Sequence, residues 1–211
     1  MGLLQLLVHN PVEFAIVAVA LLYSIIFHEM AHGWVALLFG DDTAKMAGRL
    51  TLNPISHIDP IGAAMLVIAG FGWAKPVPVS YSRLRGVRLG LISVALAGCA
   101  VNILIATAAL SALRFQAVQT NETLYTVFAV LARINLMLGA FNLIPIPPLD
   151  GSRVLETFLP FEMKEMFSRI EPFGFFILVA LLLTGILNPV ISFMQSSIEA
   201  AISLGLGLFF H

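Results

Sequence analysis

The chain has 211 residues, of which 59% are hydrophobic and only 11% are charged, and its mean hydropathy is +0.97. Soluble domains use roughly 45–50% apolar residues, so this composition indicates an integral membrane protein. The formal net charge of -1 argues against a nucleic-acid-binding surface, and we expect no nucleic-acid partner. The single cysteine, Cys99, excludes both an intramolecular disulfide and a cysteine-based zinc site.

Apolar segments long enough, or nearly long enough, to cross about 30 Å of hydrocarbon recur along the chain. They lie near residues 11–39, 87–115, 122–144, 172–187 and 189–209. Asn188-Pro189 separates the last two, and this breaker favours a tight C-terminal helical hairpin, about 172–209, over one kinked helix. Because no long polar linker or internal repeat interrupts residues 1–211, we expect a single integral membrane domain.

A shorter apolar segment, 61–72, lies between the first and second of these apolar segments and is too short to span the bilayer. It predicts a re-entrant or interfacial element. The flanking segments 43–53 and 74–81 mix polar and apolar residues with prolines, which is typical of short edge strands. The expected fold class is therefore an all-α polytopic membrane protein with about five transmembrane helices, a short re-entrant element and a small β-sheet at the membrane edge.

Basic residues predict the orientation of the chain. They gather in two loops: Lys45, Arg49, Lys75, Arg83, Arg85 and Arg88 in the first, and Arg153, Lys164 and Arg169 in the second. The positive-inside rule makes both loops cytoplasmic, provided that 61–72 does not cross the membrane. We expect a multi-pass protein of a prokaryotic plasma membrane, with the active-site side facing the cytoplasm.

The segment His28-Glu29-Met30-Ala31-His32 carries the strongest chemical signal. One turn of α-helix separates His28 from His32, so both imidazoles point towards a common ion, and Glu29 lies beside it. Zinc suits neutral imidazole ligands and can keep a coordination position open for water. An ionisable residue near the bilayer centre costs roughly 2.5–3.5 kcal/mol, so three within one turn favour a metal site over a chance motif.

Two histidines need a further ligand, and Asp150 is the best candidate. It follows a proline-rich run, 142–149, that must be enclosed by protein or trapped water, and Gly151 permits a tight return of the chain. Asp59 is a competing ligand, although a residue before proline in a loop is more often a turn or cap residue. His57 could also reach the site, and its safer interpretation is a loop histidine that bonds the local backbone.

Two further polar residues lie within predicted spans. The Asn102 amide could donate to a developing oxyanion, or it could form an interhelical hydrogen bond worth roughly 0.6 kcal/mol on average. Arg133 lies about halfway along 122–144, where a functional role and snorkelling towards a helix end are equally plausible. We assign it no catalytic role.

Several ordered motifs resemble the site-2 protease family of intramembrane zinc metalloproteases, peptidase family M50. The resemblance covers roughly residues 11–160, the expected catalytic core. The motifs are FHEMAH at 27–32, AGRLTLNPISHIDP at 47–60, GWAKPVPV at 72–79, AGCAVN at 97–102 and NLIPIPPLDG at 142–151.

This resemblance implies that His28, His32 and Asp150 bind one zinc ion, that Glu29 is the catalytic acid/base and that Asn102 assists at the active site. Cys99 stands where the family usually has proline, which predicts altered helix bending rather than lost chemistry. The loop 40–86 has no room for the PDZ domain of some relatives, so the resemblance implies a minimal form.

The expected function is hydrolysis of peptide bonds in or near transmembrane segments of membrane-protein substrates. The expected partners are such a protein or peptide and the lipid bilayer, while the oligomeric state is not specified by the sequence. A membrane metal-binding or metal-transport protein is one alternative, because intramembrane His and Asp also line ion pathways. A catalytically inactive membrane scaffold is another. A single cluster with an added glutamate base favours hydrolysis over transport, and the intact His28, Glu29, His32 and Asp150 argue against an inactive scaffold.

Overall fold

The computed structural model describes residues 3–69 and 72–209, and this part of the chain is mostly helical. Five helical segments in it are long and apolar enough to cross a membrane. They are α2 (Pro11–Leu38), α5 (Val87–Ala112), α7 (Glu122–Asn142), the segment Phe161–Leu183 and most of α11 (Asn188–Phe209). The predicted membrane protein with about five transmembrane helices is confirmed.

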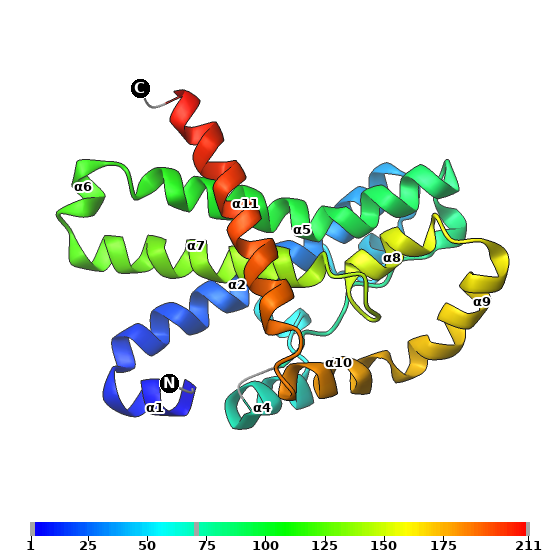
Figure 1. The fold of residues 1–211 in the computed structure, drawn as a ribbon, viewed down its shortest axis with the longest axis horizontal. Helices are drawn as coiled ribbons and strands as arrows, with labels where there is room; N and C mark the ends of the chain where they lie inside the picture. The colour runs from blue at the N-terminus through cyan, green and yellow to red at the C-terminus, as the bar shows by residue number, and fades with distance from the viewer. Residues whose placement is uncertain (1–2, 70–71, 210–211) are drawn as a thin grey trace.

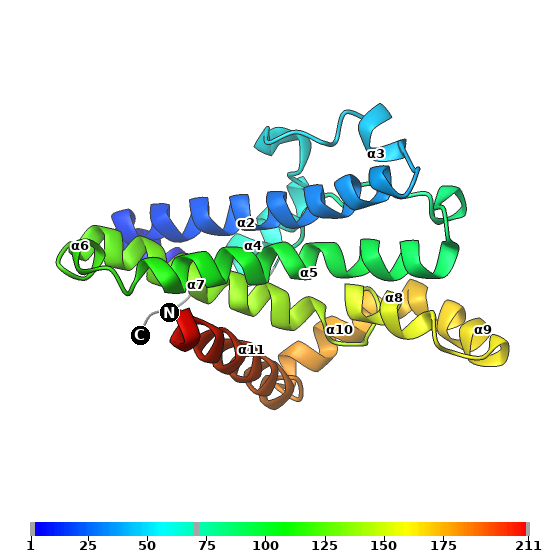
Figure 2. The same ribbon diagram turned by 90° about the horizontal axis from the view of Figure 1, so that it is seen from above.

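The core of the protein is the group of three long helices α2, α5 and α7, which lie side by side in both views (Figure 1, Figure 2). Small residues line the interfaces between these helices. Inside a lipid bilayer the hydrophobic effect does not drive helices together, so their association depends on close packing. Ala36, Ala106, Ala132 and Ala140 are all almost completely buried. This close packing brings backbone and short polar side chains of the three helices within bonding distance.

The segment between α2 and α5 contains the short helices α3 (Thr43–Met46), η1 (Pro54–Ser56), α4 (Pro60–Ala69) and η2 (Tyr81–Arg83). The predicted edge sheet is not seen: within the described residues, the structure has an isolated antiparallel bridge between Ile58 and Ala74, and Ile58 lies outside the predicted strand 43–53. In the predicted strand 43–53, polar side chains bond the backbone locally and favour turns. For example, the Asn53 side chain accepts from the Ile55 N–H and begins η1.

The predicted re-entrant element contains α4, whose ten residues are about 15 Å long, half the hydrocarbon thickness. Asp59 caps this helix by accepting from the N–H groups of Ile61 and Gly62, each at 2.9 Å. The returning chain lies directly on the helix, because a Cβ on Gly62 would stand 2.1 Å from the Trp73 carbonyl oxygen. Residues 70 and 71 of the predicted element 61–72 lie outside the described residues.

The C-terminal part differs from the predicted hairpin. Helix begins earlier than residue 172, with α8 (Asp150–Glu156), α9 (Phe161–Ile170) and η3 (Glu171–Phe173) preceding α10 (Gly174–Leu183). α9 carries several charged residues, and the continuous apolar segment read from the sequence therefore begins only after it. A turn containing Gly185 at φ +72° joins α10 to α11, and α11 then crosses the bundle steeply instead of folding back along α10 (Figure 1). The Asn188-Pro189 breaker therefore marks a sharp change of direction.

The two basic loops lie towards the same end of the bundle. Figure 2 places α3 and the α8–α9 region near one end of the long helices, while α6 (Gln116–Gln119) lies at the other end, close to the beginning of α7. The short helix α1 (Leu3–His9) precedes α2. The predicted loops thus share one end, as a positive-inside arrangement requires.

A buried carboxylate, Asp41, holds the end of α2 to the segment before η2. It accepts from the Ser80 N–H at 2.6 Å and the Thr43 N–H at 3.1 Å, and from the Thr43 hydroxyl. Burial by itself raises the pKa of this carboxyl, but the hydrogen bonds from Thr43 and Ser80 and the charge of Arg83 outweigh burial and lower the pKa. The ionised form therefore stabilises this connection.

We predict that Asp41→Asn lowers the free energy of unfolding by about 1–3 kcal/mol at pH 7, because the new amide group faces N–H donors. The pKa is lowered in the folded state, so the stabilisation is present above the ordinary value of about 3.9 and is lost as the pH falls through the folded-state value. Thermal unfolding in detergent from pH 7 down to pH 3 should show the difference between the two proteins shrinking. Asp42→Asn is the matched control, since Asp42 forms a half-exposed ion pair with Arg83. Equal losses in both variants would contradict the role of Asp41.

Candidate metal centre

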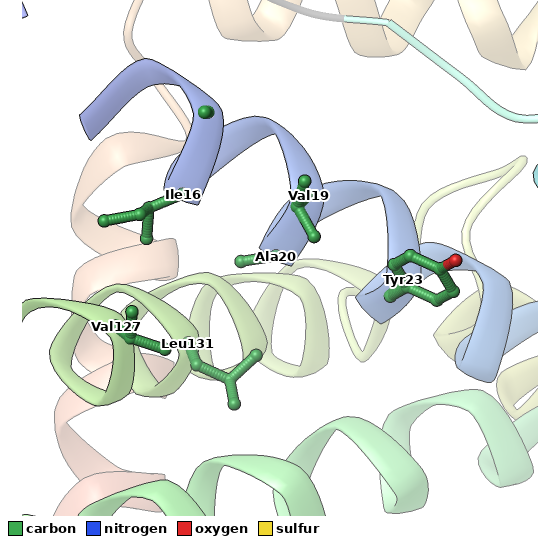
Figure 3. Close-up of a pocket in the computed structure, with 7 residues that line it drawn as sticks. Ile16, Val19, Ala20, Tyr23, Val127 and Leu131 are labelled. Atoms are coloured by element: carbon green, nitrogen blue, oxygen red, sulfur yellow. The ribbon is translucent and has the colours of Figure 1, made fainter. Parts of the chain in front are cut away.

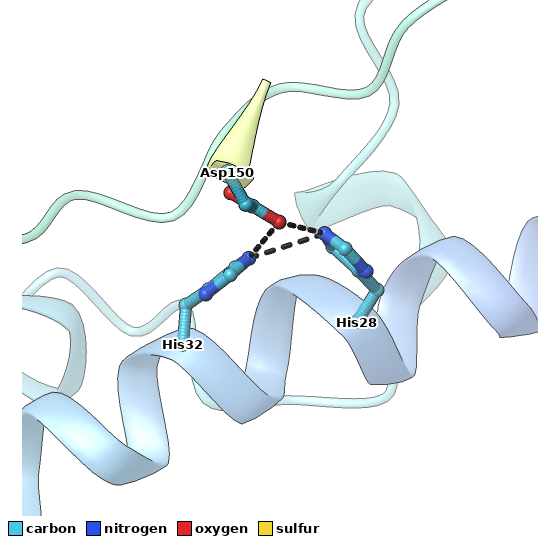
Figure 4. A group of neighbouring side chains, drawn as sticks. All are labelled: His28, His32 and Asp150. Carbon is cyan, nitrogen blue, oxygen red and sulfur yellow. Dashed lines mark hydrogen bonds and ion pairs between the residues drawn. The ribbon is translucent and has the colours of Figure 1, made fainter. Parts of the chain in front are cut away.

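Three side chains converge where α2 meets the start of α8 (Figure 4). The Nε2 atoms of His28 and His32 lie 3.1 Å apart, and the Asp150 Oδ2 atom lies 3.1 Å from the first and 3.3 Å from the second. Both histidines are at least nine-tenths buried. The structure therefore brings together the three residues that the sequence singled out as metal ligands.

The proline-rich connection between α7 and α8 carries Asp150 to this position. Asp150 is the first residue of α8, and the chain turns back tightly just before it. A Cβ on Gly151 would stand 2.2 Å from the Leu143 carbonyl oxygen, so only glycine fits between α8 and the end of α7. This is the tight return that the sequence predicted at Gly151.

The alternative ligands are engaged elsewhere. Asp59 caps α4, which is the turn-or-cap role weighed against metal binding. The His57 Nε2 atom lies 2.8 Å from the Thr51 carbonyl oxygen and donates to it, so this histidine bonds the local backbone. Neither residue joins the cluster of His28, His32 and Asp150.

The second ring nitrogen of each histidine sets where its proton lies. The His32 Nδ1 atom lies 2.7 Å from the Val94 carbonyl oxygen, which can only accept, so this nitrogen carries the proton. The His28 Nδ1 atom lies 2.6 Å from the Asn102 Oδ1 atom and donates to it. Each Nε2 atom is then left with a lone pair that faces the other two residues of the cluster.

This donor set fits a zinc ion. With both protons on Nδ1, two nitrogen lone pairs and a carboxylate oxygen oppose one another in a buried place, which is unfavourable unless a cation lies among them. Zinc at about 2.0–2.1 Å from tetrahedral ligands places those ligands about 3.3–3.4 Å apart. The observed separations of 3.1–3.3 Å are close to that spacing.

Glu29 lies next to the cluster and is held by the segment that returns from α4. Its Oε2 atom accepts from the Val77 N–H at 2.8 Å. Within the described residues, the structure records no other hydrogen bond to this carboxylate. The backbone N–H of Val77 thus orients one oxygen of Glu29, while the other oxygen is available to accept a proton.

The Asn102 amide is fully used by protein groups. Its Nδ2 atom donates to the Asn135 Oδ1 atom at 2.8 Å and to the Ser24 carbonyl oxygen at 3.4 Å, and its Oδ1 atom accepts from His28. No amide hydrogen is left for an oxyanion. Of the two roles that the sequence left open, the geometry favours interhelical bonding, with the addition that the bond ends on a candidate ligand.

Gly98 is a site residue that sequence reasoning treated only as a small packing residue. A Cβ at this position would stand 2.4–2.6 Å from three atoms of the His28 ring, so the imidazole lies directly against the α5 backbone. The glycine in AGCAVN, four residues before Asn102, was the available signal. Gly98 gives His28 the space that its position requires.

Two other residues singled out by sequence have clear positions. The Cys99 thiol is buried and donates to the Asp150 Oδ2 atom at a sulfur–oxygen distance of 3.8 Å. Arg133 is exposed on the outside of α7 and belongs to no part of the cluster.

An apolar groove of about 460 Å³ lies between α2 and α7 (Figure 3). Its lining contains no residue of the candidate metal centre. The lining residues are Ala15, Ile16, Val19, Ala20, Tyr23, Val127 and Leu131. The groove is therefore separate from the cluster of His28, His32 and Asp150.

Fold and site together define a polytopic membrane protein with a candidate zinc centre in its helical core. The family model of peptidase family M50 matches residues 115–185. YwhC of Bacillus subtilis (strain 168), a candidate zinc metalloprotease, is 39% identical over 173 residues, which are 79% of this chain and 79% of YwhC. Rip2 of Mycobacterium tuberculosis (strain H37Rv), also a candidate zinc metalloprotease, is 33% identical over 83% of this chain and 69% of its own length.

A solved structure supports the fold. The site-2 protease from Methanocaldococcus jannaschii superposes with a TM-score of 0.50 at 23% sequence identity, over 94% of this chain and 83% of that one. On the strength of the sequence relatives, the chain belongs to peptidase family M50.

We predict that Gly98→Ala weakens zinc binding by at least about 10-fold, because the new methyl group displaces the His28 ring from the cluster. Zinc affinity of the purified protein, measured by competition with a chelator of known affinity, reports the effect. Gly205→Ala is the matched control, since a Cβ there meets no atom within 4 Å in α11. Unchanged affinity in Gly98→Ala would show that the ring does not depend on this contact.

Proposed function

We infer that this protein is an intramembrane zinc metalloprotease, which hydrolyses peptide bonds in or near transmembrane segments of membrane proteins. The observation that carries this inference is the convergence of His28, His32 and Asp150 beside Glu29 within a membrane helix bundle. Membership of peptidase family M50 supports the same reaction. The site-2 type of protease is the class that this combination fits.

In this proposal, the Nε2 atoms of His28 and His32 and the Asp150 carboxylate would hold one zinc ion. Zinc bound there supplies a Lewis acid that polarises the scissile carbonyl and lowers the pKa of water from about 15.7 towards about 7. The hydrogen bonds that His32 donates to Val94 and His28 donates to Asn102 hold both imidazoles in the orientation that presents Nε2. Asn102 is therefore a positioning residue in this mechanism.

Glu29 is the proposed general base and acid. It takes a proton from the attacking water as the water oxygen bonds to the carbonyl carbon, and it returns a proton to the leaving amine as the carbon–nitrogen bond breaks. The Val77 N–H holds one carboxylate oxygen, which limits the rotation of the side chain. Glu29 then remains aimed at the site through both proton transfers.

The depth of the site constrains the substrate. His28 and His32 lie within α2, so the scissile bond must enter the helix bundle below the membrane surface. A transmembrane helix uses its carbonyl groups in its own hydrogen bonds, and the cleaved region must unwind locally before water can attack. We expect substrates whose spans contain helix-weakening residues near the cut.

We further propose that residues 1–211 act as a single membrane domain with its catalytic core at about 11–160. Both basic loops are assigned to the cytoplasm of a prokaryotic cell, since they lie at one end of the bundle (Figure 2). The site is then closer to the cytoplasmic surface than to the outer one.

Glu29→Gln should retain zinc and lose cleavage, by at least about 100-fold, because glutamine cannot accept the proton from water. Metal content is measured on the purified protein. Cleavage is followed on a co-reconstituted membrane protein, chosen by comparing membrane proteomes of cells that make the wild type or this variant. Glu199→Gln, an exposed position on α11, is the matched control. Wild-type cleavage in Glu29→Gln would exclude this mechanism, and metal flux in place of cleavage would support a transporter.

Orientation is tested with cysteines introduced at opposite ends of the bundle. Ser82→Cys and Thr120→Cys occupy exposed positions, while the native Cys99 is buried. A membrane-impermeant maleimide should label Thr120→Cys in intact cells and Ser82→Cys only in inside-out vesicles. The reverse pattern would overturn the cytoplasmic assignment.

A further inference from the structure

Asn135 is a completely buried residue of α7 that belongs to none of the predicted motifs. We propose that it is a positioning residue: acting through Asn102, it fixes the proton of His28 on Nδ1 and keeps the Nε2 lone pair directed at the metal site. The proposal rests on the zinc-binding role inferred above for His28. The path is the series of hydrogen bonds that runs from the Leu131 carbonyl through Asn135 and Asn102 to His28. The partners of each amide determine which of its two ends faces the next residue.

The path begins at a backbone carbonyl. The Asn135 Nδ2 atom lies 2.9 Å from the Leu131 carbonyl oxygen and 2.8 Å from the Ser24 hydroxyl oxygen. A carbonyl oxygen can only accept, so the amide nitrogen, and not the amide oxygen, must face Leu131. The Asn135 Oδ1 atom therefore points towards Asn102.

The next step has its own independent constraint. The Asn102 Nδ2 atom lies 2.8 Å from the Asn135 Oδ1 atom and 3.4 Å from the Ser24 carbonyl oxygen, and both of these are acceptors. Reversing the Asn102 amide would oppose its oxygen to two other oxygens. The Oδ1 atom of Asn102 is thus left facing His28 at 2.6 Å, and the His28 Nδ1 atom must donate.

Without this path, a competing arrangement is open to His28. The Asp150 Oδ2 atom lies 3.1 Å from the His28 Nε2 atom, close enough to accept a hydrogen bond from it. An Nε2–H group would make that bond and would leave no lone pair for a metal. If Asn102 reversed, its amide would donate to Nδ1 and stabilise this second tautomer. The Asn135–Asn102 pair disfavours it.

Burial raises the free-energy cost of reversing either amide. Ser24, Asn102 and Asn135 are at most 1% exposed, on α2, α5 and α7 respectively. A reversed amide would leave polar groups unpaired in a dry interior, at a cost that bulk water would otherwise relieve. The neighbouring groove is lined by apolar and small side chains apart from Tyr23 (Figure 3). The three helices therefore share one directed set of hydrogen bonds.

The tautomer can be read in the metal-free protein by nuclear magnetic resonance of ¹⁵N-labelled histidine rings. The chain has five histidines, and a His28→Asn variant identifies the His28 signals. Zinc affinity, measured by chelator competition, is the second readout. In the wild type we expect the Nδ1–H form of His28. A wild type that bound no zinc would overturn the proposed function, while the tautomer would still be measured.

Asn135→Leu removes the path, and we expect it to shift His28 towards the Nε2–H form and to weaken zinc binding about 10-fold or more. Asn135→Asp should stay close to the wild type. Burial keeps such a carboxyl protonated, so that its carbonyl accepts from Asn102 and its hydroxyl donates to Leu131. Thr107→Val, which removes a half-buried hydrogen bond to the Ile103 carbonyl on α5, is the matched control.

The proposal is overturned if Asn135→Leu keeps the Nδ1–H form with zinc affinity within about threefold of the wild type. Equal losses in Asn135→Asp and Asn135→Leu would also overturn it, because they would indicate a purely structural role. If Asn135→Leu does not fold, the His28 tautomer in Asn135→Asp and Ser24→Ala tests the proposal instead. Both retain the bond to the Leu131 carbonyl, so an Nε2–H form in these two variants contradicts the proposal.

Discussion

Two imidazole nitrogens and one carboxylate oxygen face each other within 3.3 Å inside an apolar bundle, and most of the structure serves to hold them there. Acceptor atoms this close repel one another, and the low dielectric of the interior strengthens that repulsion. A cation turns the same arrangement into a favourable one. The three acceptor atoms therefore form a site that a metal cation stabilises.

Each of the three core helices contributes to this arrangement in a different way. α2 supplies both histidines one turn apart, and α5 supplies the Gly98 surface on which one ring lies. α7 ends in the proline-rich connection that delivers Asp150, and it also carries Asn135 at the beginning of the hydrogen-bond path. The small residues between the helices let these parts approach, so that packing and chemistry depend on the same close contacts.

The sequence predicted what local pattern specifies. The apolar lengths predicted the membrane helices, the spacing of His28 and His32 predicted their shared direction, and the prolines with Gly151 predicted the return that brings in Asp150. Features that depend on distant partners were not predictable. The bond between Asn135 and Asn102 and the direction of α11 both depend on contacts between separate segments.

The ligands are far apart along the chain, because the two histidines belong to the first long helix of the core and Asp150 follows the last one. During membrane insertion, a chain that contains only α2 and α5 has two of the three residues of the cluster and lacks its carboxylate. The full donor set is present only after the chain has been made as far as α8, because Asp150 is the first residue of that helix. A partly inserted chain that lacks α8 therefore does not contain the complete cluster of His28, His32 and Asp150.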